Sequence, residues 1–288
     1  MIDADGLVTK SEREQFAQDG VVCLRQRFEP EWIEMLADGI DSNMAAPSPL
    51  YAENRSPDGK GRYCEDTWIW QRFPQFRKFI FDSPAAQIAA RLLSARRINL
   101  VMDLWMYREA GTQASAPWHH DISYMDIDGR ICVLWLPLDP VTSDSCVAVV
   151  RGSHLWNKLF LRVWFKDHSV DGEPGWINGQ YYEAPPDIDN HPQDYDIAQF
   201  DMQPGDALVF DIRALHGFPR NVLPTSSVRR FTLRMCAEDG VLRYRGDWAE
   251  RERRIIEAAG HKNGDAMCSE FFPTLFEESS DFRINQAN

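Results

Sequence analysis

Length, composition and charge restrict the classes to which this chain can belong. It has 288 residues, 44% of them hydrophobic, which is enough for a sizeable core in one large domain or two small ones. A formal net charge of -13 argues against nucleic acid or an anionic membrane as partner, since both select basic surfaces. No apolar run approaches a membrane span, residues 1–5 lack the start of a signal peptide, and the six cysteines form no C-x-x-C pair. We therefore expect a cytoplasmic protein with reduced thiols.

Helix signals stand in the N-terminal part of the chain, over about residues 1–97. They are, in chain order, a capping box from Ser11 to Glu14 before a helix ending near Gly20, the opening Glu29-Pro30-Glu31-Trp32, and Ser83-Pro84 ahead of an apolar stripe of Ile88, Leu92 and Leu93. A loop rich in Pro, Gly and Asn is expected over residues 46–61.

Strand patterns dominate from residue 98 onward. The strand-like runs are residues 98–107, 130–138, 146–150, 207–212 and 229–236. A last helix is expected over residues 248–259, within a C-terminal part that spans 237–288. Helices first and short strands afterwards predict an α+β chain, mainly β, with a jelly-roll core over about residues 98–236 and flanking helices, in one domain spanning 1–288.

Residues 155–203 are too long for a tight connection between jelly-roll strands. The segment is rich in aromatic residues, namely Trp156, Trp164, Trp176, Tyr181 and Tyr182. This many aromatic side chains argue against disorder. We expect a lid-like insertion that covers a substrate, with a homodimer contact as the alternative.

The segment Trp118-His119-His120-Asp121 contains the residues most indicative of chemistry. On an extended strand, His119 and Asp121 point to the same side while His120 points away. His216 lies 97 residues after His119, in a loop-like segment that follows a short strand, and would supply a third ligand through the fold. Two imidazoles and one carboxylate on one face of a metal suit Fe(II) and leave other positions open.

An arginine follows this set in Val228-Arg229-Arg230-Phe231-Thr232-Leu233-Arg234-Met235. Arg229 shares its parity with apolar residues, so the alternation predicts that it faces the interior and that Arg230 faces outward. A buried guanidinium needs an anion, and its planar fork matches a carboxylate. Arg229 would then hold the distal carboxylate of 2-oxoglutarate, unless a protein carboxylate pairs with it.

From about Asn99 to Met235 the sequence resembles the phytanoyl-CoA dioxygenase family, in its bacterial small-molecule branch. The resemblance rests on segments in a fixed order: Pro117-Trp118-His119-His120-Asp121, Val133 to Asp139, Arg151-Gly152-Ser153-His154, Pro204-Gly205-Asp206, His216-Gly217 and Arg229-Arg230. It implies a double-stranded β-helix (a cupin-like jelly roll), iron on His119, Asp121 and His216, and 2-oxoglutarate on Arg229. It also implies that Trp135 lines the co-substrate pocket. The loop between His216 and Arg229 is slightly long for the family.

The resemblance further implies an Fe(II)- and 2-oxoglutarate-dependent dioxygenase that uses O2 and releases succinate and CO2. Because Asp121 is present, we expect hydroxylation of an unactivated C–H of a small-molecule metabolite and not halogenation, with no catalytic residue beyond the metal ligands. Two alternatives remain. The same ligands suit a zinc hydrolase, and a relative of the fold can bind ligands without catalysis.

The substrate is the least determined part of the sequence analysis. Asp103, Trp105 and Tyr107, two residues apart, share one face of the first long strand, and Trp118 and Tyr124 bracket the metal motif. Aromatic rings with a carboxylate could enclose a quaternary ammonium group. They could equally be ordinary filling of the barrel.

Overall fold

One large antiparallel sheet organises the chain, in a computed structural model that describes residues 6–56, 59–113, 115–165, 167–218, 223–246 and 249–278. In spatial order its strands are β1 (Val21–Leu24), β12 (Ala207–Asp211), β6 (Ile131–Pro137), β14 (Val228–Ala237), β4 (Arg97–Arg108), β3 (Arg62–Thr67) and β2 (Ala52–Arg55), and β16 (Thr274–Glu277) also pairs with β4. Strands distant in sequence are thus neighbours, and β14 lies between β6 and β4.

Smaller sheets complete the barrel. One has the order β11 (Ile197–Ala198), β7 (Ala148–Val150), β13 (His216–Gly217), and another pairs β15 (Val241–Leu242) with β5 (Ile127–Asp128). Apolar side chains of β7 and β11 pack across the barrel against side chains of β6 and β12 in one buried cluster. The predicted mainly β chain with a jelly-roll core is confirmed.

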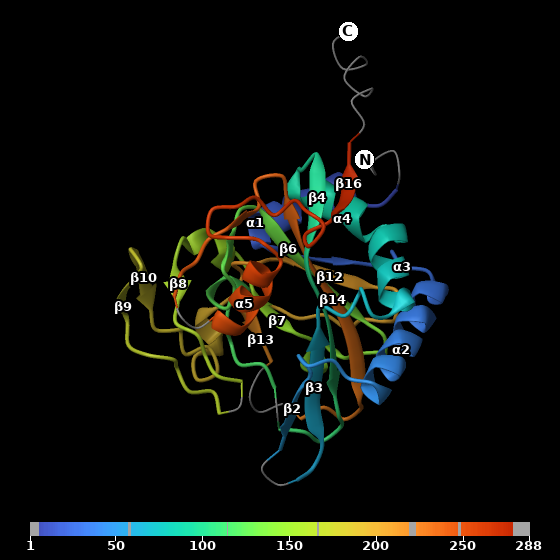
Figure 1. Cartoon of the computed structure of the whole chain (residues 1–288). Coiled ribbons are helices and arrows are strands. Elements are labelled where there is room, and N and C mark those ends of the chain that lie inside the picture. Colours follow the sequence, from blue (N-terminus) through green and yellow to red (C-terminus); the bar gives the residue numbers. More distant parts are fainter. Residues whose placement is uncertain are drawn as a thin grey trace.

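Helices cover the face of the large sheet that is turned away from the barrel interior. They are α1 (Lys10–Asp19), α2 (Pro30–Ala45), α3 (Pro74–Asp82) and α4 (Ala85–Leu93), and Figure 1 shows α2 and α3 along one side of the sheet. A fifth helix, α5 (Glu250–Ala258), lies after the last barrel strand. The apolar stripes of the first four helices share one buried cluster with the outward residues of β4, β6 and β14.

Side chains of β14 alternate between two buried environments, because both faces of the large sheet are covered. Phe231, Leu233 and Met235 belong to the helix-facing cluster. The ring of Phe231 stacks on Phe76 of α3 at a centroid distance of 5.3 Å and meets Phe79 edge-on at 5.5 Å. The opposite parity of β14 therefore faces the barrel interior.

The N-terminal elements differ from the predicted ones in detail. The capping box of α1 is formed by Thr9 and Glu12, not by Ser11 and Glu14, and Gly20 ends the helix in the left-handed conformation as expected. Both the Thr9–Glu12 and the Ser11–Glu14 segments fit the capping-box pattern. Glu12 also forms an ion pair with Arg27 at 2.8 Å, a tertiary contact that local sequence does not reveal.

Several short elements were not anticipated. The helix α3 and the strands β1 and β3 have no counterpart among the predicted elements, and β2 lies inside the expected loop at residues 46–61. These strands have four to six residues. β1 pairs with the distant β12 and β3 with β4, whereas β2 pairs with the neighbouring β3, so their formation depends on tertiary pairing more than on local propensity. The last helix begins at Glu250 rather than at residue 248, which lies outside the described residues.

The long insertion carries its own small sheet. Its strands are β8 (Leu159–Phe160), β10 (Gln180–Glu183) and β9 (Gly175–Ile177), which stand on the side of the molecule opposite to α2 and α3 (Figure 1).

Short 3-10 turns occur along the chain at Asp121–Ser123, Ser143–Ser145, Ser153–Trp156 and Pro192–Asp194. Tyr124, after the first of these turns, fixes the insertion to the barrel, because its hydroxyl exchanges hydrogen bonds with the backbone of Val163 at 2.7 and 2.8 Å.

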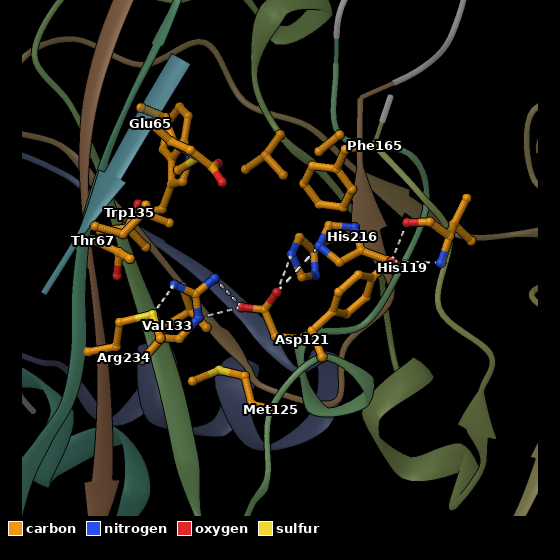
Figure 2. Close-up of a pocket in the computed structure, with 18 of the residues that line it drawn as sticks. Glu65, Thr67, His119, Asp121, Met125, Val133, Trp135, Phe165, His216 and Arg234 are labelled. Carbon is orange, nitrogen blue, oxygen red and sulfur yellow. Dashed lines mark hydrogen bonds and ion pairs between the residues drawn. The ribbon is translucent and has the colours of Figure 1, made fainter. Parts of the chain in front are cut away.

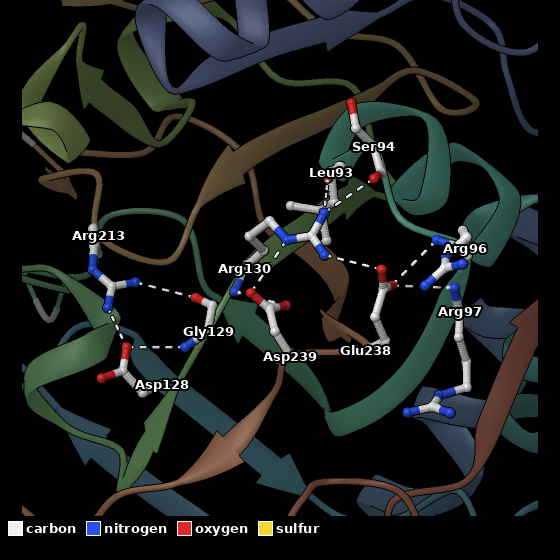
Figure 3. Close-up of polar contacts among 10 residues, drawn as sticks. All are labelled: Leu93, Ser94, Arg96, Arg97, Asp128, Gly129, Arg130, Arg213, Glu238 and Asp239. Carbon is white, nitrogen blue, oxygen red and sulfur yellow. Dashed lines mark hydrogen bonds and ion pairs between the residues drawn. The ribbon is translucent and has the colours of Figure 1, made fainter.

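Arg130, just before β6, connects three parts of the scaffold. Its guanidinium donates to the carbonyl oxygens of Leu93 and Ser94 at the end of α4, where helix carbonyls lack partners within the helix. It also pairs with Glu238 and Asp239, just after β14, at 3.1 and 3.2 Å (Figure 3). These contacts fix α4 against the ends of two barrel strands.

Cysteine and membrane expectations can be compared with the described residues. All six cysteines have free thiols, four of them buried, while Cys23 is partly exposed and Cys268 is exposed. Among the described helices, none combines the length and apolarity that crossing a bilayer requires.

The packing of Phe231 leads to a prediction on stability. Phe231→Ala should lower the free energy of unfolding by about 3–5 kcal/mol, because it leaves a cavity between the sheet and α3. Phe231→Leu, which keeps most of the volume, should cost about 1.5 kcal/mol or less. Leu155→Ala is the control, since Leu155 is 65% exposed and its loss should change stability by about 0.5 kcal/mol at most. Urea unfolding measures all three; equal effects of Phe231→Ala and Leu155→Ala would contradict the assignment of Phe231 to the helix-facing side.

Candidate functional site

The two histidines of the predicted metal set are brought together by the backbone. His119 and His216 form an isolated antiparallel bridge, in which the N–H of each donates to the carbonyl oxygen of the other at 2.9 and 2.8 Å. Gly217 permits this approach, because a Cβ at that position would lie 2.7 Å from the carbonyl oxygen of Pro117. The Leu215-His216-Gly217 segment is thus placed by close contact of two chain segments far apart in sequence.

The orientation of both imidazoles is set by hydrogen bonds. Nδ1 of His119 lies 2.7 Å from the carbonyl oxygen of Pro117, and Nδ1 of His216 lies 2.9 Å from that of Ala214. A carbonyl can only accept, so Nδ1 carries the proton in both rings and Nε2 is left with a free lone pair. Burial, with His119 nearby, lowers the pKa of His216 to about 3, so that ring is neutral and ready to bind a metal.

Asp121 completes the set. It begins the 3-10 turn η1 (Asp121–Ser123), and its Oδ1 lies 3.3 Å from Nε2 of His119 and 3.6 Å from Nε2 of His216. Ligand atoms of the three residues lie within 4.8 Å of one another, and all three side chains are buried. Imidazole, carboxylate and imidazole gathered in this way fit Fe(II), and the convergence expected from the sequence is present (Figure 2).

The second oxygen of Asp121 is held by Arg234 on β14. Nε and Nη2 of Arg234 lie 2.8 and 2.7 Å from Oδ2 of Asp121, a bidentate contact that leaves Oδ1 toward the two histidines. Burial opposes ionisation of Asp121, but the positive charge of Arg234 outweighs it and keeps the pKa of this carboxyl below its usual range. Arg234 was not among the predicted site residues.

His120 points away from the metal set, as the alternation predicted. Its Nε2 accepts the backbone N–H of Phe160 at 3.1 Å and contacts the hydroxyl of Ser123. Burial, together with the neighbouring His119 and His216, lowers the pKa of His120 to about 3. His120 therefore links the turn η1 to the strand β8 of the insertion.

The orientation predicted for Arg229 is wrong. Arg229 lies on the helix-facing side of β14, where its side chain forms a bidentate pair with Asp139 at 2.9 and 3.2 Å and approaches Asp41 at 3.6 Å. The inward parity is Arg230, Thr232 and Arg234. The alternation itself is present in β14. Both of its faces are buried, so apolar residues occur on each, and hydrophobicity does not distinguish the face that lines the site from the face that packs on the helices.

Arg230 lies in the barrel interior and is 1% exposed. Its guanidinium carbon lies 4.7, 5.7 and 5.8 Å from the ring centroids of Phe218, Trp135 and Tyr63. Its Nε and Nη2 have no hydrogen-bond partner among the described residues, nor does the hydroxyl of Thr232, the next inward residue. Burial lowers the pKa of Arg230.

A cavity of about 490 Å³ opens above the metal set. The large sheet supplies one wall and the insertion supplies another, through Arg162, Val163, Trp164 and Phe165. Trp135 and Tyr124, both expected at the site, line this cavity (Figure 2 labels Trp135). A metal set at the base of a largely apolar pocket can hold a small molecule beside the metal.

Three other predicted substrate residues lie elsewhere. Asp103 and Trp105 occupy the helix-facing parity of β4: Asp103 accepts the backbone N–H of Ile69 at 3.2 Å, and Trp105 donates to Asn43 of α2. Trp118 donates from Nε1 to Asp189 at 3.0 Å and packs in a separate apolar cluster. Asp103 and Trp105 were assigned to the wrong side because a strand covered on both faces has two buried sets of side chains. Trp118 lies outside the strands, and its packing in the separate cluster turns it away from the cavity.

The inward residues of β3 and β4 were missed by the sequence analysis. The cavity is lined from these strands by Tyr63, Glu65, Thr67, Met102, Leu104 and Met106. The alternation of β4 was visible in the sequence, so choosing its other parity would have found Met102, Leu104 and Met106. No comparable signal marked β3, which is recognised only by its pairing with β4.

Comparison with known proteins agrees with this geometry. The model of the phytanoyl-CoA dioxygenase (PhyH) family matches residues 16–231, which is most of the chain. No curated protein matched the sequence.

Solved structures share the fold at low sequence identity. One of them is the alpha ketoglutarate dependent carbocyclase SnoK from nogalamycin biosynthesis, with 15% identity, a TM-score of 0.67, and coverage of 93% of this chain and 96% of SnoK. The epimerase SnoN, in complex with Fe3+, alpha ketoglutarate and nogalamycin RO, has 14% identity, a TM-score of 0.69, and coverage of 92% and 98%. EctD from S. alaskensis, with 2-oxoglutarate and 5-hydroxyectoine, has 18% identity, a TM-score of 0.61, and coverage of 83% and 79%.

The family match and the buried metal set lead to the same conclusion. The match extends through His119, Asp121 and His216. The expected enzyme class and its cofactors, iron and 2-oxoglutarate, are thereby confirmed. The chain belongs to the phytanoyl-CoA dioxygenase family and is an enzyme of the iron- and 2-oxoglutarate-dependent oxygenase type.

Proposed function

We propose that this protein is a dioxygenase that hydroxylates an unactivated C–H of a small-molecule metabolite, with release of succinate and CO2. The observation that carries the proposal is the buried set of His119, Asp121 and His216 at the base of a cavity of about 490 Å³. Iron and 2-oxoglutarate, when bound, would supply the oxidising chemistry. The protein's own residues orient the ligand atoms, hold the co-substrate and position the substrate.

Positioning of the ligand atoms is the first contribution of the protein. The Nδ1 protons of the two histidines are fixed on backbone carbonyls, so no rearrangement is needed before Nε2 binds a metal. Arg234 keeps Asp121 ionised and holds one of its oxygens, so the other remains available. We assign the metal-ligand role to these three residues and no catalytic role to His120.

We further propose that Arg230, in place of Arg229, holds the distal carboxylate of 2-oxoglutarate. A buried guanidinium with two unpaired nitrogens is costly until an anion reaches it. The unpaired hydroxyl of Thr232, two residues along the same face, would add a donor to that anion. Trp135 pairs with Thr232 in the sheet and lies beside Arg230, which supports its proposed place at the co-substrate.

Exclusion of water from the co-substrate follows from the rings around Arg230. Phe218, Trp135 and Tyr63 line the cavity and also contact the guanidinium. A carboxylate that enters between them loses its hydration and pairs with a cation in a weakly screened environment. The pair would therefore contribute strongly to binding of the co-substrate.

The metal assignment can be tested without a substrate. Anaerobic Fe(II) with 2-oxoglutarate should give a weak visible absorption band in the wild-type protein, and His119→Ala or His216→Ala should abolish it. His120→Gln is the matched control and should keep the band, because His120 faces the insertion. Persistence of the band in both alanine variants, or its loss only in His120→Gln, would contradict the assignment.

The co-substrate assignment predicts different effects for two adjacent arginines. Arg230→Ala should weaken 2-oxoglutarate binding by about 30- to 4,000-fold, the range for loss of a buried charge-assisted pair. Arg229→Ala removes only a partly exposed pair with Asp139 and should change binding little. Anaerobic titration of the Fe(II)-loaded proteins by calorimetry measures both.

The free protein provides a control for this pair of variants. Without 2-oxoglutarate, Arg230→Ala should unfold at the wild-type temperature or above it, because it removes a buried cation that lacks a partner. A larger loss of 2-oxoglutarate affinity in Arg229→Ala than in Arg230→Ala would return the role to Arg229.

Hydroxylation as the outcome is tested by the product. A metabolite screen for substrate-dependent consumption of 2-oxoglutarate should identify a compound whose product gains one oxygen atom, with one succinate formed per product. Mass spectrometry with 18O2 should show the label in the product. A product of unchanged mass, or one that has lost two hydrogens, would instead indicate epimerisation or ring closure, which are the activities named for SnoN and SnoK.

A further inference from the structure

Among the described residues, three acidic side chains line the cavity, and two of them are already paired. Asp121 belongs to the metal set and is held by Arg234. Glu252, at the start of α5, is contacted by Arg251. Glu65, in the middle of β3, forms no ion pair with any residue that the structure describes.

The sheet places Glu65 directly on the cavity wall. Along one row of paired residues, Glu65 of β3 lies beside Met106 of β4, and Met106 lies beside Arg230 of β14. All three occupy the inward parity of their strands. Figure 2 shows the carboxylate of Glu65 projecting into the cavity, across the open space from His119, His216 and Phe165.

The arginines near Glu65 are engaged with other groups. Arg234, Arg251 and Arg230 attract the carboxylate at longer range than an ion pair. Arg234 is bound to Asp121, Arg251 contacts Glu252, and Arg230 lies among three aromatic rings. The hydroxyl of Tyr63, two residues earlier on the same face, is a neutral polar neighbour of the carboxylate.

Glu65 is half-buried, and its partial removal from water is the dominant influence on its carboxyl. It raises the pKa of Glu65 above its usual value in spite of the attraction of Arg234, Arg251 and Arg230 and the polar contact of Tyr63. An ionised carboxylate in such a place is costly unless a cation pairs with it. A neutral hydroxyl would offset less of that cost than a charged donor would.

We propose that Glu65 binds a protonated amine of the substrate and so determines substrate specificity, an inference that rests on the proposed function of the cavity. The rest of the substrate would be apolar, because Met102, Met106, Val163 and Phe165 form the surrounding wall. With the amine held on β3, the carbon skeleton extends across the cavity toward His119 and His216. Glu65 thereby selects which C–H of the substrate faces the metal set.

The test compares charged and neutral ligands of equal shape. The probes are arylalkyl amines and the alcohols with the same carbon skeletons, titrated by calorimetry into iron-free protein and into anaerobic protein loaded with Fe(II) and 2-oxoglutarate. The best amine should bind wild-type protein at least about tenfold more tightly than its alcohol, as expected for a hydrogen bond to a charged group.

The variant Glu65→Gln keeps the shape and the hydrogen-bonding oxygen but removes the charge. It should weaken amine binding about 10- to 100-fold and leave alcohol binding within about threefold of wild type. Glu252→Gln is the matched control, because Glu252 also lines the cavity, and it should preserve the preference for amines since Arg251 already engages Glu252. Thermal unfolding of Glu65→Gln at or above the wild-type temperature shows that the fold is intact.

Several results would overturn the assignment. These are equal binding of amines and alcohols by the wild type, failure of every amine to bind, an unchanged amine affinity in Glu65→Gln, or an equal loss for amines and alcohols, which would indicate a hydroxyl ligand instead. The absorption band of Fe(II) with 2-oxoglutarate, recorded on the same samples, separates the two proposals. A normal band without amine preference rejects only the role of Glu65, whereas absence of the band rejects the proposed function.

Discussion

Burial of both faces of the large sheet is the constraint on which the rest of this structure depends. Strand β14 lies between β6 and β4, with helices against one face and the cavity against the other. Its residues therefore serve two purposes in alternation: Phe231 and Leu233 join the sheet to the helices, while Arg230 and Arg234 face the site. A change that shifted the register by one residue would exchange these two sets of side chains.

The site itself is assembled from backbone contacts more than from side-chain packing. The bridge between His119 and His216 joins two segments by paired main-chain hydrogen bonds, and carbonyl oxygens next to each histidine orient its ring. Arg234, from the opposite sheet, then fixes Asp121. Because each ligand is held by a different part of the barrel, the arrangement of the three depends on closure of the whole jelly roll.

Charged side chains around the cavity differ in whether they are paired, and the unpaired ones suggest separate binding sites for the co-substrate and the substrate. Asp121 and Arg234 neutralise each other beside the metal set. Arg230, which is buried on β14, and Glu65, which is half-buried on β3, form no ion pair with the described residues. A charged group that is largely removed from water and lacks an ion-pair partner favours a ligand of opposite charge. An anionic co-substrate on β14 and a cationic substrate group on β3 would satisfy both, which connects the two proposals by one electrostatic argument.

Sequence alone determined the fold class, the enzyme type and the metal ligands. The H-x-D spacing, the distant His216 and the ordered family motifs were enough for the fold class, the enzyme type and the convergence of the three ligands. Tertiary structure decided which face of each strand lines the cavity, because a strand buried on both sides gives no contrast between apolar and polar parity. That is why Arg229, Asp103 and Trp105 were assigned to the wrong side. Glu65 was out of reach for a different reason: β3 is short, and only its pairing with β4 brings this carboxylate into the cavity.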